Sequence, residues 1–252
     1  MIGIGSPTFC QTPFLDMLED ISKHFQLWEL LSEGEDLIHL IRDPVKMARE
    51  SFDIEFQVHA PLSDVNIGSV HEPMRLAAVN EIRQTLVQCR HLDIPLVTIH
   101  PGFVQGIAFL DKKRAVVKTR ESIMDIALTA EDLGVAVAVE NMPANINATC
   151  THASELLEVV QGSGLGICFD MGHANTAGQL EEMLKLAGKF TNVHLHNNEG
   201  QWDQHNKVDE GSADLARVVS ALRESYKGNI IIEATDLESG VESKTVLEDL
   251  LR

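Results

Sequence analysis

The sequence predicts a single α/β domain, residues 1–252, folded as a (β/α)8 TIM barrel. Short apolar runs alternate with amphipathic segments eight times, at a period of roughly 30 residues. Such alternation is typical of a parallel sheet. The length of 252 residues suits one closed barrel of eight units. A hydrophobic content of 44% is enough for a sizeable core.

The predicted strands are short apolar runs that often end in a polar residue. The run 135–140 is almost unbroken and ends in a carboxylate, which is typical of a strand covered on both faces. Gly34, Pro61, Pro101 and Gly134 bound several of these runs, because both residue types interrupt regular structure. In order, the predicted strands are residues 2–5, 27–31, 54–59, 95–100, 135–140, 165–170, 192–196 and 229–233.

The predicted helices lie between these strands and have apolar residues at helical spacing. In the third helix this spacing forms one stripe, made of Leu76, Val79, Ile82, Leu86 and Val87. The predicted helices are residues 14–21, 36–52 with an interruption at Pro44, 72–90, 111–133, 153–160, 179–189, 214–225 and 246–251. A doubly wound open sheet is the alternative, but no Gly-x-Gly-x-x-Gly follows any strand, so its dinucleotide-binding version lacks a phosphate loop.

Composition argues against several classes of partner. The chain has 38 Asp and Glu against 20 Lys and Arg, a formal charge of −18, which repels nucleic-acid phosphates and anionic membranes. No apolar run approaches the ~20 residues of a membrane span. Four cysteines without Cys-x-x-Cys spacing, and no signal peptide, indicate a cytoplasmic protein with reduced thiols.

The segment 192–205 carries the strongest local signal of chemistry. Val193 and Leu195 alternate with His194 and His196, so both imidazoles point to the face opposite the two apolar side chains. An inward imidazole must be paired or ligated, or it destabilises the fold. The following loop ends in Asp203-Gln204-His205, which adds a carboxylate and an imidazole. This set suits a metal such as Zn or Mn.

Similar residues end most of the other strands, and carboxyl ends of barrel strands converge on one mouth. Taken singly, these residues have ordinary explanations: a hydrogen-bonded histidine, a glutamate paired with Lys or Arg, a helix N-cap for Asp170, or a solvated loop residue. Taken together they favour a metal site, because a cation neutralises crowded carboxylates. The candidate ligands are five histidines and four carboxylates: His59, His100, Glu140, Asp170, His173, His194, Asp203, His205 and Glu233.

We further assign His196, Asn66 and Trp202 to substrate binding. His196 shares the inward face of His194 but lies one pair further along, so a supporting position beside the metal is the other interpretation. The five remaining histidines fall on predicted helices or at their starts and are expected at the surface: His24, His39, His71, His91 and His152.

The ordered motifs from His59 to Glu233 resemble the xylose isomerase-like barrel superfamily, which includes sugar isomerases, epimerases and the endonuclease IV (AP endonuclease family 2) branch. They are His59-Ala60-Pro61, His100-Pro101-Gly102, Glu140-Asn141, Asp170-x-x-His173, His194-Leu195-His196-Asn197, Asp203-x-His205 and Glu233. In the isomerase branch, the resemblance implies one divalent metal on Glu140, Asp170, His194 and Glu233. It also implies that Glu140 and Glu233 act as acid and base.

In the endonuclease branch, the same resemblance implies three zinc ions on all nine positions. The sequence departs from that branch at several points. Asp170-Met171-Gly172-His173 replaces its usual Asp-Thr-Cys-His, and Asp209-Glu210-Gly211 replaces the first Gly of its Gly-x-Gly. The opening strand lacks that branch's histidine, and the loop 32–36 is acidic where a DNA-binding loop should carry Arg.

We therefore predict an isomerase or epimerase of a small sugar, polyol or sugar phosphate that uses one to three divalent ions, Zn or Mn, with Mg as a further candidate. The alternative is a zinc-dependent phosphodiester hydrolase of the endonuclease IV type. A third interpretation is a barrel that binds a metabolite or stores metal without catalysis.

Overall fold

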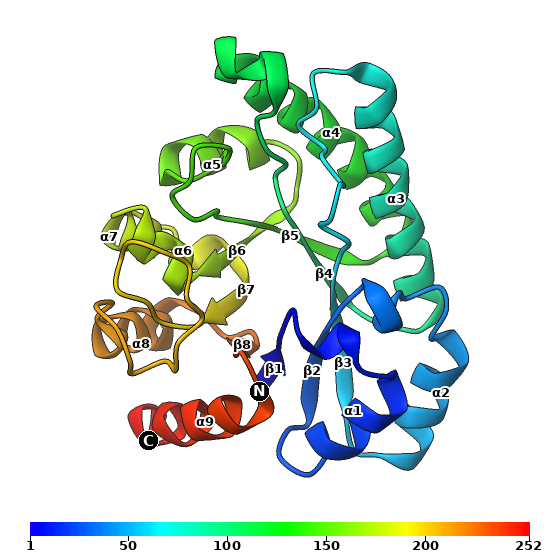
Figure 1. The fold of residues 1–252 in the computed structure, drawn as a ribbon, viewed down its shortest axis with the longest axis vertical. Coiled ribbons are helices and arrows are strands. Elements are labelled where there is room, and N and C mark those ends of the chain that lie inside the picture. Colours follow the sequence, from blue (N-terminus) through cyan, green and yellow to red (C-terminus); the bar gives the residue numbers. More distant parts are fainter.

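The computed structural model describes residues 1–252 and confirms the predicted barrel. Eight parallel strands pair in chain order, β1 to β8, and β8 pairs with β1 to close the barrel. The strands surround the centre of the view in Figure 1, with the helices outside them. The strands are β1 (Ile2–Gly5), β2 (Leu27–Leu31), β3 (Glu55–His59), β4 (Leu96–Ile99), β5 (Ala136–Glu140), β6 (Gly166–Asp170), β7 (Phe190–Leu195) and β8 (Ile230–Glu233).

Nine α-helices rather than eight cover the barrel. The α-helices are α1 (Phe14–Ile21), α2 (Arg42–Ser51), α3 (Glu72–His91), α4 (Lys112–Leu133), α5 (Ala153–Val160), α6 (Met171–Thr176), α7 (Leu180–Leu184), α8 (Leu215–Ser225) and α9 (Leu237–Leu251). Four short 3-10 helices are η1 (Phe9–Gln11), η2 (Gly34–Asp36), η3 (Gly106–Leu110) and η4 (Ala187–Lys189). Gly134 ends α4 with a φ of 66°, the left-handed conformation that glycine adopts without strain.

Three helix predictions need correction, and one short helix was not predicted. The helix expected over 36–52 begins only at Arg42, and Pro44 lies in its first turn, where a missing N–H costs nothing. The helix expected over 179–189 is α7 followed by η4. The last helix begins at Leu237 instead of 246, capped by the Asp236 side chain. The short helix α6 was not expected, because its six residues show no apolar period.

The third helix, α3, also differs in one position of its expected stripe. Val79, Ile82 and Leu86 are buried, but Leu76 is 48% exposed. Arg75 is buried instead, and its guanidinium binds Glu72 on the same helix and the Ser122 hydroxyl on α4. Arg75 thus occupies the position at the interface of α3 and α4 that the sequence pattern assigned to Leu76. Its burial is tolerated because its guanidinium is hydrogen-bonded.

Outward-facing strand residues and the inner faces of the helices together form the core between barrel and helices, a cluster of 59 buried residues. Trp28 on β2 stacks on Phe14 of α1 with ring centroids 5.3 Å apart. Phe56 on β3 packs against both rings. Full burial of each such side chain contributes on the order of 2–3 kcal/mol to the stability of the fold, so this cluster stabilises the packing of α1 against the sheet.

Inward-facing residues are arranged in layers along the barrel axis. Leu96, Ala138 and Cys168 form a small apolar cluster inside the barrel, and Cys168 Sγ lies within 4.8 Å of ligand atoms of Glu140 and His194. A polar layer comprises Glu29, Gln57, Thr98 and Asn192, joined by side-chain hydrogen bonds. The strand-end histidines and carboxylates lie above that layer. The barrel is therefore filled, and its chemistry is confined to one end.

Two expectations, one about the thiols and one about the surface histidines, are met. All four cysteines are free and buried. His24, His39, His71, His91 and His152 are exposed. Within this chain, no helix combines the length and the apolar character needed to cross a membrane.

Candidate metal centre and active site

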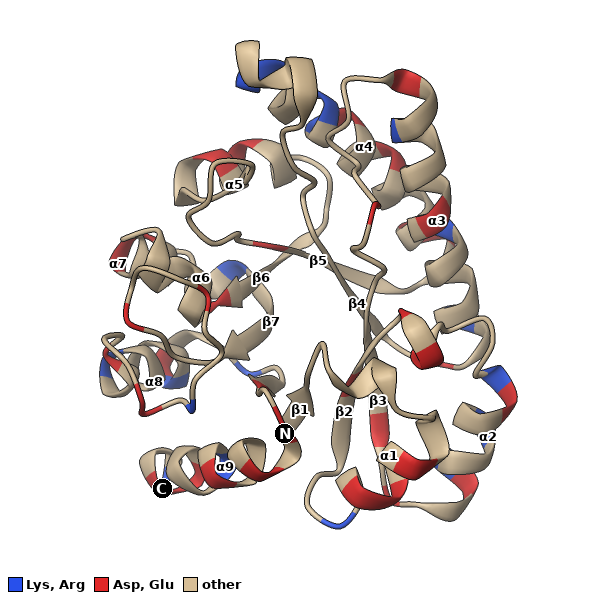
Figure 2. Ribbon diagram, in the orientation of Figure 1, with Lys and Arg blue, Asp and Glu red and all other residues tan.

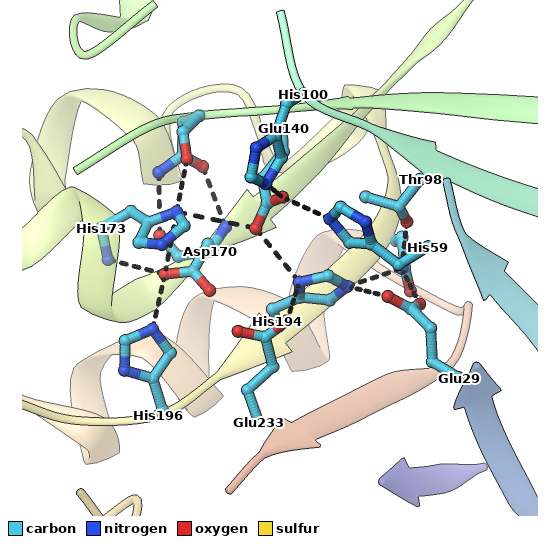
Figure 3. A network of polar contacts seen from close by, with 12 residues as sticks. Glu29, His59, Thr98, His100, Glu140, Asp170, His173, His194, His196 and Glu233 are labelled. Atoms are coloured by element: carbon cyan, nitrogen blue, oxygen red, sulfur yellow. Dashed lines mark hydrogen bonds and ion pairs between the residues drawn. The ribbon is translucent and has the colours of Figure 1, made fainter. Parts of the chain in front are cut away.

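The carboxyl ends of four strands bring together Glu140, Asp170, His194 and Glu233. One ligand atom from each of the four residues lies within 4.8 Å of the others. Nδ1 of His194 is 3.1 Å from Oε1 of Glu140 and 2.9 Å from Oε1 of Glu233. Figure 3 shows the three carboxylates around this imidazole. Three carboxylates and one imidazole form a hard, oxygen-rich set that suits Mn²⁺ or Mg²⁺ and also accepts Zn²⁺.

The second oxygen of Glu140 faces two further imidazoles. Oε2 lies 3.2 Å from Nε2 of His59 and 3.1 Å from Nε2 of His100. These two rings meet edge to face, with centroids 4.8 Å apart. His59, His100 and Glu140 therefore make a second group that adjoins the first through a shared carboxylate.

A third group lies on the other side of Asp170, at the start of α6 and in the loop after β7. It contains His173, His196, Asp203 and His205. Oδ2 of Asp203 is 3.1 Å from Nε2 of His173 and 3.3 Å from Nε2 of His205. The structure thus gathers all nine predicted ligands at one end of the barrel; that they bind metal stays a prediction.

Asp170 has two functions at the junction of these groups. It caps α6, because Oδ1 accepts the backbone N–H of His173 at 2.6 Å. Its other oxygen, Oδ2, is buried and has no hydrogen-bond partner. The N-cap interpretation of Asp170 is therefore correct for one oxygen, and the second oxygen remains free for a cation.

The tautomers of His59 and His173 favour a cation in this site. Nδ1 of each ring lies 2.8 Å from a backbone carbonyl oxygen, that of Ala60 for His59 and that of Asn141 for His173. A carbonyl only accepts, so both Nδ1 atoms carry hydrogen. In the neutral ring, Nε2 then presents a lone pair to a carboxylate, an arrangement that needs a proton or a metal between them.

The electrostatics point the same way. Burial disfavours the charged form of His173, but the negative Asp170 and Asp203 outweigh it and raise its pKa well above the usual value. The same balance of burial against nearby charge raises the pKa of His205 to about 9. Burial also opposes ionisation of Glu140, yet the surrounding imidazoles hold its pKa well below the usual range. Without metal, protons on His173 and His205 offset the charge of the neighbouring carboxylates.

Buried polar atoms without partners supply an independent test of fit. Besides Oδ2 of Asp170, they include both ring nitrogens of His196 and Nδ1 of His205. Buried polar atoms are rarely left unpaired, since each one costs about 1–3 kcal/mol. Imidazole nitrogens and carboxylate oxygens are the donors of Zn²⁺ and Mn²⁺ sites, so these residues fit a bound divalent cation.

Glu29 is a member of the site that the sequence analysis missed. Its Oε1 lies 2.8 Å from Nε2 of His194, an ion-pair contact outside hydrogen-bond geometry, while Nδ1 is the nitrogen that faces Glu140 and Glu233. Oε2 of Glu29 accepts hydrogen bonds from Gln57 and Asn192. The available signal was a carboxylate in the middle of the apolar run Leu27-Trp28-Glu29-Leu30-Leu31. A carboxylate behind an imidazole in this way orients metal-binding histidines.

A cavity of about 210 Å³ opens above the ligand groups. It is lined by residues that include Ser6, His59, His100, Glu140, His205 and Glu233, and none of its thirteen lining residues is Lys or Arg. Drug-sized ligands usually occupy roughly 300–1,000 Å³, so this cavity suits a smaller molecule. A larger hollow of about 560 Å³ near Gly164 lies at the opposite ends of the strands and contains no histidine or carboxylate.

The three residues assigned to substrate binding do not line this cavity. Asn66 Oδ1 accepts the backbone N–H groups of Gly68 and Phe103, and its amide donates to the Phe103 carbonyl. Its polar atoms are thus used in holding two loops together. His196 is a fully buried member of the third group, and Trp202 is 75% exposed on the loop after β7.

Comparison with known proteins gives a consistent family assignment. Residues 25–251 match the family model described as a xylose isomerase-like TIM barrel. An uncharacterized protein of Methanocaldococcus jannaschii is 32% identical across 99% of this chain and 88% of that protein. A probable endonuclease 4 of Aquifex aeolicus is 25% identical, over 70% of this chain and 68% of that protein.

Solved structures with the same fold include several sugar epimerases. A D-tagatose 3-epimerase-like protein has a TM-score of 0.92 and 31% identity, with 99% of this chain and 96% of that chain covered. The D-psicose 3-epimerase of Clostridium cellulolyticum H10, solved with D-tagatose, has a TM-score of 0.81 and 17% identity over 100% and 98% of the two chains. The IOLI protein, solved with a zinc atom, has a TM-score of 0.79 and 17% identity over 99% and 97%. The last two likenesses show the fold alone.

Proposed function

This chain belongs to the xylose isomerase-like TIM barrel family, and from that premise we propose that it is a metal-dependent isomerase or epimerase of a small, unphosphorylated sugar. The observation that carries the proposal is the pair of glutamates from β5 and β8, Glu140 and Glu233, on either side of His194. The likeness to a D-tagatose 3-epimerase-like protein at 31% identity supports the same class of substrate.

In this proposal Glu140, Asp170, His194 and Glu233 hold one divalent ion. When bound, the ion acts as a Lewis acid that draws electron density from the substrate's carbonyl and makes the neighbouring C–H more acidic. One glutamate accepts the proton from that carbon, and the other returns a proton to the opposite face or to the adjacent carbon. Burial opposes ionisation of both glutamates, but the charge on His194 outweighs it and lowers the pKa of each, so both start ionised. The glutamate that returns a proton therefore first takes that proton from solvent.

The cavity favours an uncharged substrate. Its lining contains no Lys or Arg, the side chains that bind phosphate groups most often. Ser6 and His100 lie in the lining and can exchange hydrogen bonds with sugar hydroxyls. We therefore place free ketoses ahead of polyols and sugar phosphates. Four buried free thiols fit the further proposal of a cytoplasmic protein.

The direct test is exchange of solvent deuterium into substrate carbon. The chain, reconstituted with Mn²⁺, Co²⁺ or Zn²⁺, is incubated in D₂O with a panel of ketoses and their phosphates, and incorporation is followed by NMR. We expect exchange and a new stereoisomer with at least one free ketose, and a rate lowered by roughly 10²–10⁴ in Glu140→Gln and Glu233→Gln. Glu199→Gln, on the exposed loop after β7, is the matched control and should exchange at the wild-type rate.

Two outcomes would refute the proposal. If no sugar of the panel incorporates deuterium with any of the metals, the chain does not catalyse the isomerase or epimerase reaction proposed. If Glu140→Gln leaves every measured activity unchanged, the glutamate pair has no catalytic function, and a barrel that binds a metabolite or stores metal is then the better interpretation.

The second candidate is zinc-dependent hydrolysis of a phosphodiester of the endonuclease IV type. The third group of ligands favours it, because His173, Asp203 and His205 complete the nine-residue set beside the first metal position. The charge of −18 opposes binding to DNA, and acidic residues outnumber basic ones over the elements in Figure 2. Three metals per chain together with nicking of abasic-site DNA would promote this reaction over the isomerase.

A further inference from the structure

The outer face of α4 carries apolar side chains that no other part of the chain covers. α4 lies on the outside of the barrel and packs against α3 and α5 (Figure 1). Its inner face is buried, but Val117, Met124 and Leu128 are 54%, 39% and 63% exposed. They are spaced seven and four residues apart, so they form one row along the helix. A hollow lined in part by Val117, Met124 and Glu158 borders this row.

The two ends of the same face carry opposite charges. Lys113 and Arg114 lie in the first turn of α4, and Glu131 and Asp132 lie in the last. Each basic residue lies 18 residues before an acidic one, which is five full helical turns, so the four side chains flank the apolar row on the same face. All four are exposed, and none forms an ion pair within the chain.

These charges are placed against the dipole of the helix. The N-terminus of a helix is positive and favours acidic side chains, whereas its C-terminus favours basic ones. α4 has no acidic residue in its first turn and no basic residue in its last turn. The arrangement therefore weakens the isolated helix. It becomes favourable when the basic end of one helix contacts the acidic end of another.

We propose that the chain forms a homodimer in which α4 of one copy packs antiparallel against α4 of a second copy. A two-fold axis at the midpoint of Lys112–Leu133 places Lys113 opposite Glu131 of the second copy, and Arg114 opposite its Asp132. The same two contacts recur on the other side of the axis. A contact of this kind uses one self-complementary patch on both copies, as in most homodimers.

The middle of this contact is apolar. The same axis places Val117 of each copy against Leu128 of the other. Glu121 shares the face, but Lys118 offsets its charge, with Nζ 2.6 Å from the carboxylate. Parallel packing would instead bring like charges together at both ends. Two chains of charge −18 repel each other in general, so local charge complementarity decides where they associate.

The test measures the oligomeric state of the whole chain by sedimentation velocity and light scattering over a range of concentrations. We expect the wild type to dimerise, and Leu128→Asp to raise the dissociation constant by at least roughly tenfold. Leu15→Asp is the matched control and should dimerise like the wild type, because Leu15 is also an exposed leucine on a helix, α1. A wild-type chain that is monomeric at concentrations on the order of 100 μM would overturn the proposal.

Charge reversal tests the antiparallel arrangement. Lys113→Glu with Arg114→Glu makes both ends of the face acidic, and Glu131→Lys with Asp132→Lys makes both ends basic. Each double variant alone should be monomeric, whereas an equimolar mixture of the two should form a heterodimer. The new charges follow the helix dipole, so the melting temperature should not fall and unfolding would not explain a monomer. A mixture that stays monomeric, or double variants that dimerise like the wild type, would overturn the proposal.

Two exposed lysines outside α4 supply the control for net charge. Lys46→Glu with Lys227→Glu lowers the net charge as much as the acidic double variant does, and it should dimerise like the wild type. Loss of the dimer in this control would show that total charge decides association, which would also overturn the proposal. The inference rests on α4 alone and holds whether or not the chain acts on a sugar.

Discussion

Replacing Glu29 by Gln tests whether the polar layer inside the barrel tunes the metal site above it. Glu29 lies in the middle of β2 and not at a strand end like most of the predicted ligands. Its carboxylate is nevertheless 2.8 Å from Nε2 of His194. The substitution keeps the size of the side chain and its acceptor oxygen but removes the negative charge. His194 Nδ1 then becomes a weaker donor to the cation, because the negative charge behind the imidazole ring is lost.

The expected magnitude follows from that single contact. Loss of an outer carboxylate from a metal-binding histidine typically lowers metal affinity by about 10- to 100-fold, or roughly 1.4–2.7 kcal/mol. The effect should be largest above neutral pH. Burial opposes a charge on His194, but negative neighbours including Glu29 raise its pKa well above the usual value. Removal of Glu29 therefore also weakens proton competition, which offsets part of the loss at low pH.

Competition titrations with a chromophoric chelator at pH 6, 7 and 8.5 measure this effect. Asp36→Asn is the control, because Asp36 is also a buried carboxylate but contacts no ligand histidine. Affinity in Glu29→Gln within twofold of wild type at pH 8.5, in a folded protein, would show that the contact does not tune the site.

Three further predictions test other parts of the structure. Burial, with repulsion from Glu35, raises the pKa of Asp36 to about 7, so the folded state binds its proton more tightly than the unfolded state. This costs stability as pH rises from about 4 to 7, and Asp36→Asn should therefore stabilise the protein by up to roughly 4 kcal/mol at pH 8 and by little at pH 4. Urea denaturation at the two pH values checks this, with exposed Asp132→Asn as control. Metal binding should release protons, and affinity should rise with pH up to about 9, because the pKa of His205 is raised to that value. Calorimetry in buffers of different ionisation enthalpy measures the protons, and affinity that is flat above pH 7 would contradict the prediction. Gly3→Ala should destabilise the barrel by about 1–3 kcal/mol, since its Cβ would lie 2.7 Å from Leu27 Cγ and 2.8 Å from Ile231 Cδ1. A melting temperature equal to that of wild type would refute this packing argument.

Local pattern accounts for most of the fold and for the composition of the site. The alternation at His194 and His196 correctly predicts that both rings are turned toward the site, where they face Glu140 and Asp170, because a strand has a strict two-residue period. The carboxyl ends of β3 to β8 carry most of the predicted ligands, and a parallel barrel brings those ends to one rim. Helix boundaries were less predictable where capping or glycine decided them, as at Asp236 and Gly240 in α9.

Local sequence patterns do not predict contacts between segments that are distant in the chain. Glu29 and His194 are separated by most of the chain, and only barrel closure places them in one layer. The amide side chain of Asn66 is of a type that can bind sugar hydroxyls, but its polar atoms form hydrogen bonds with the backbones of two loops instead. Gly172 and His196 likewise share one space although nothing in their local sequence indicates it.

The sequence alone determined the strand order, the inward faces and the kinds of ligand at the mouth, because each depends on periodicity within a few residues. The tertiary structure decided how those ligands divide into groups, which carboxylate supports which imidazole and which polar residues are left without partners. The physical reason is that these features depend on the register between strands, and that register is set only when β8 pairs with β1 and closes the barrel.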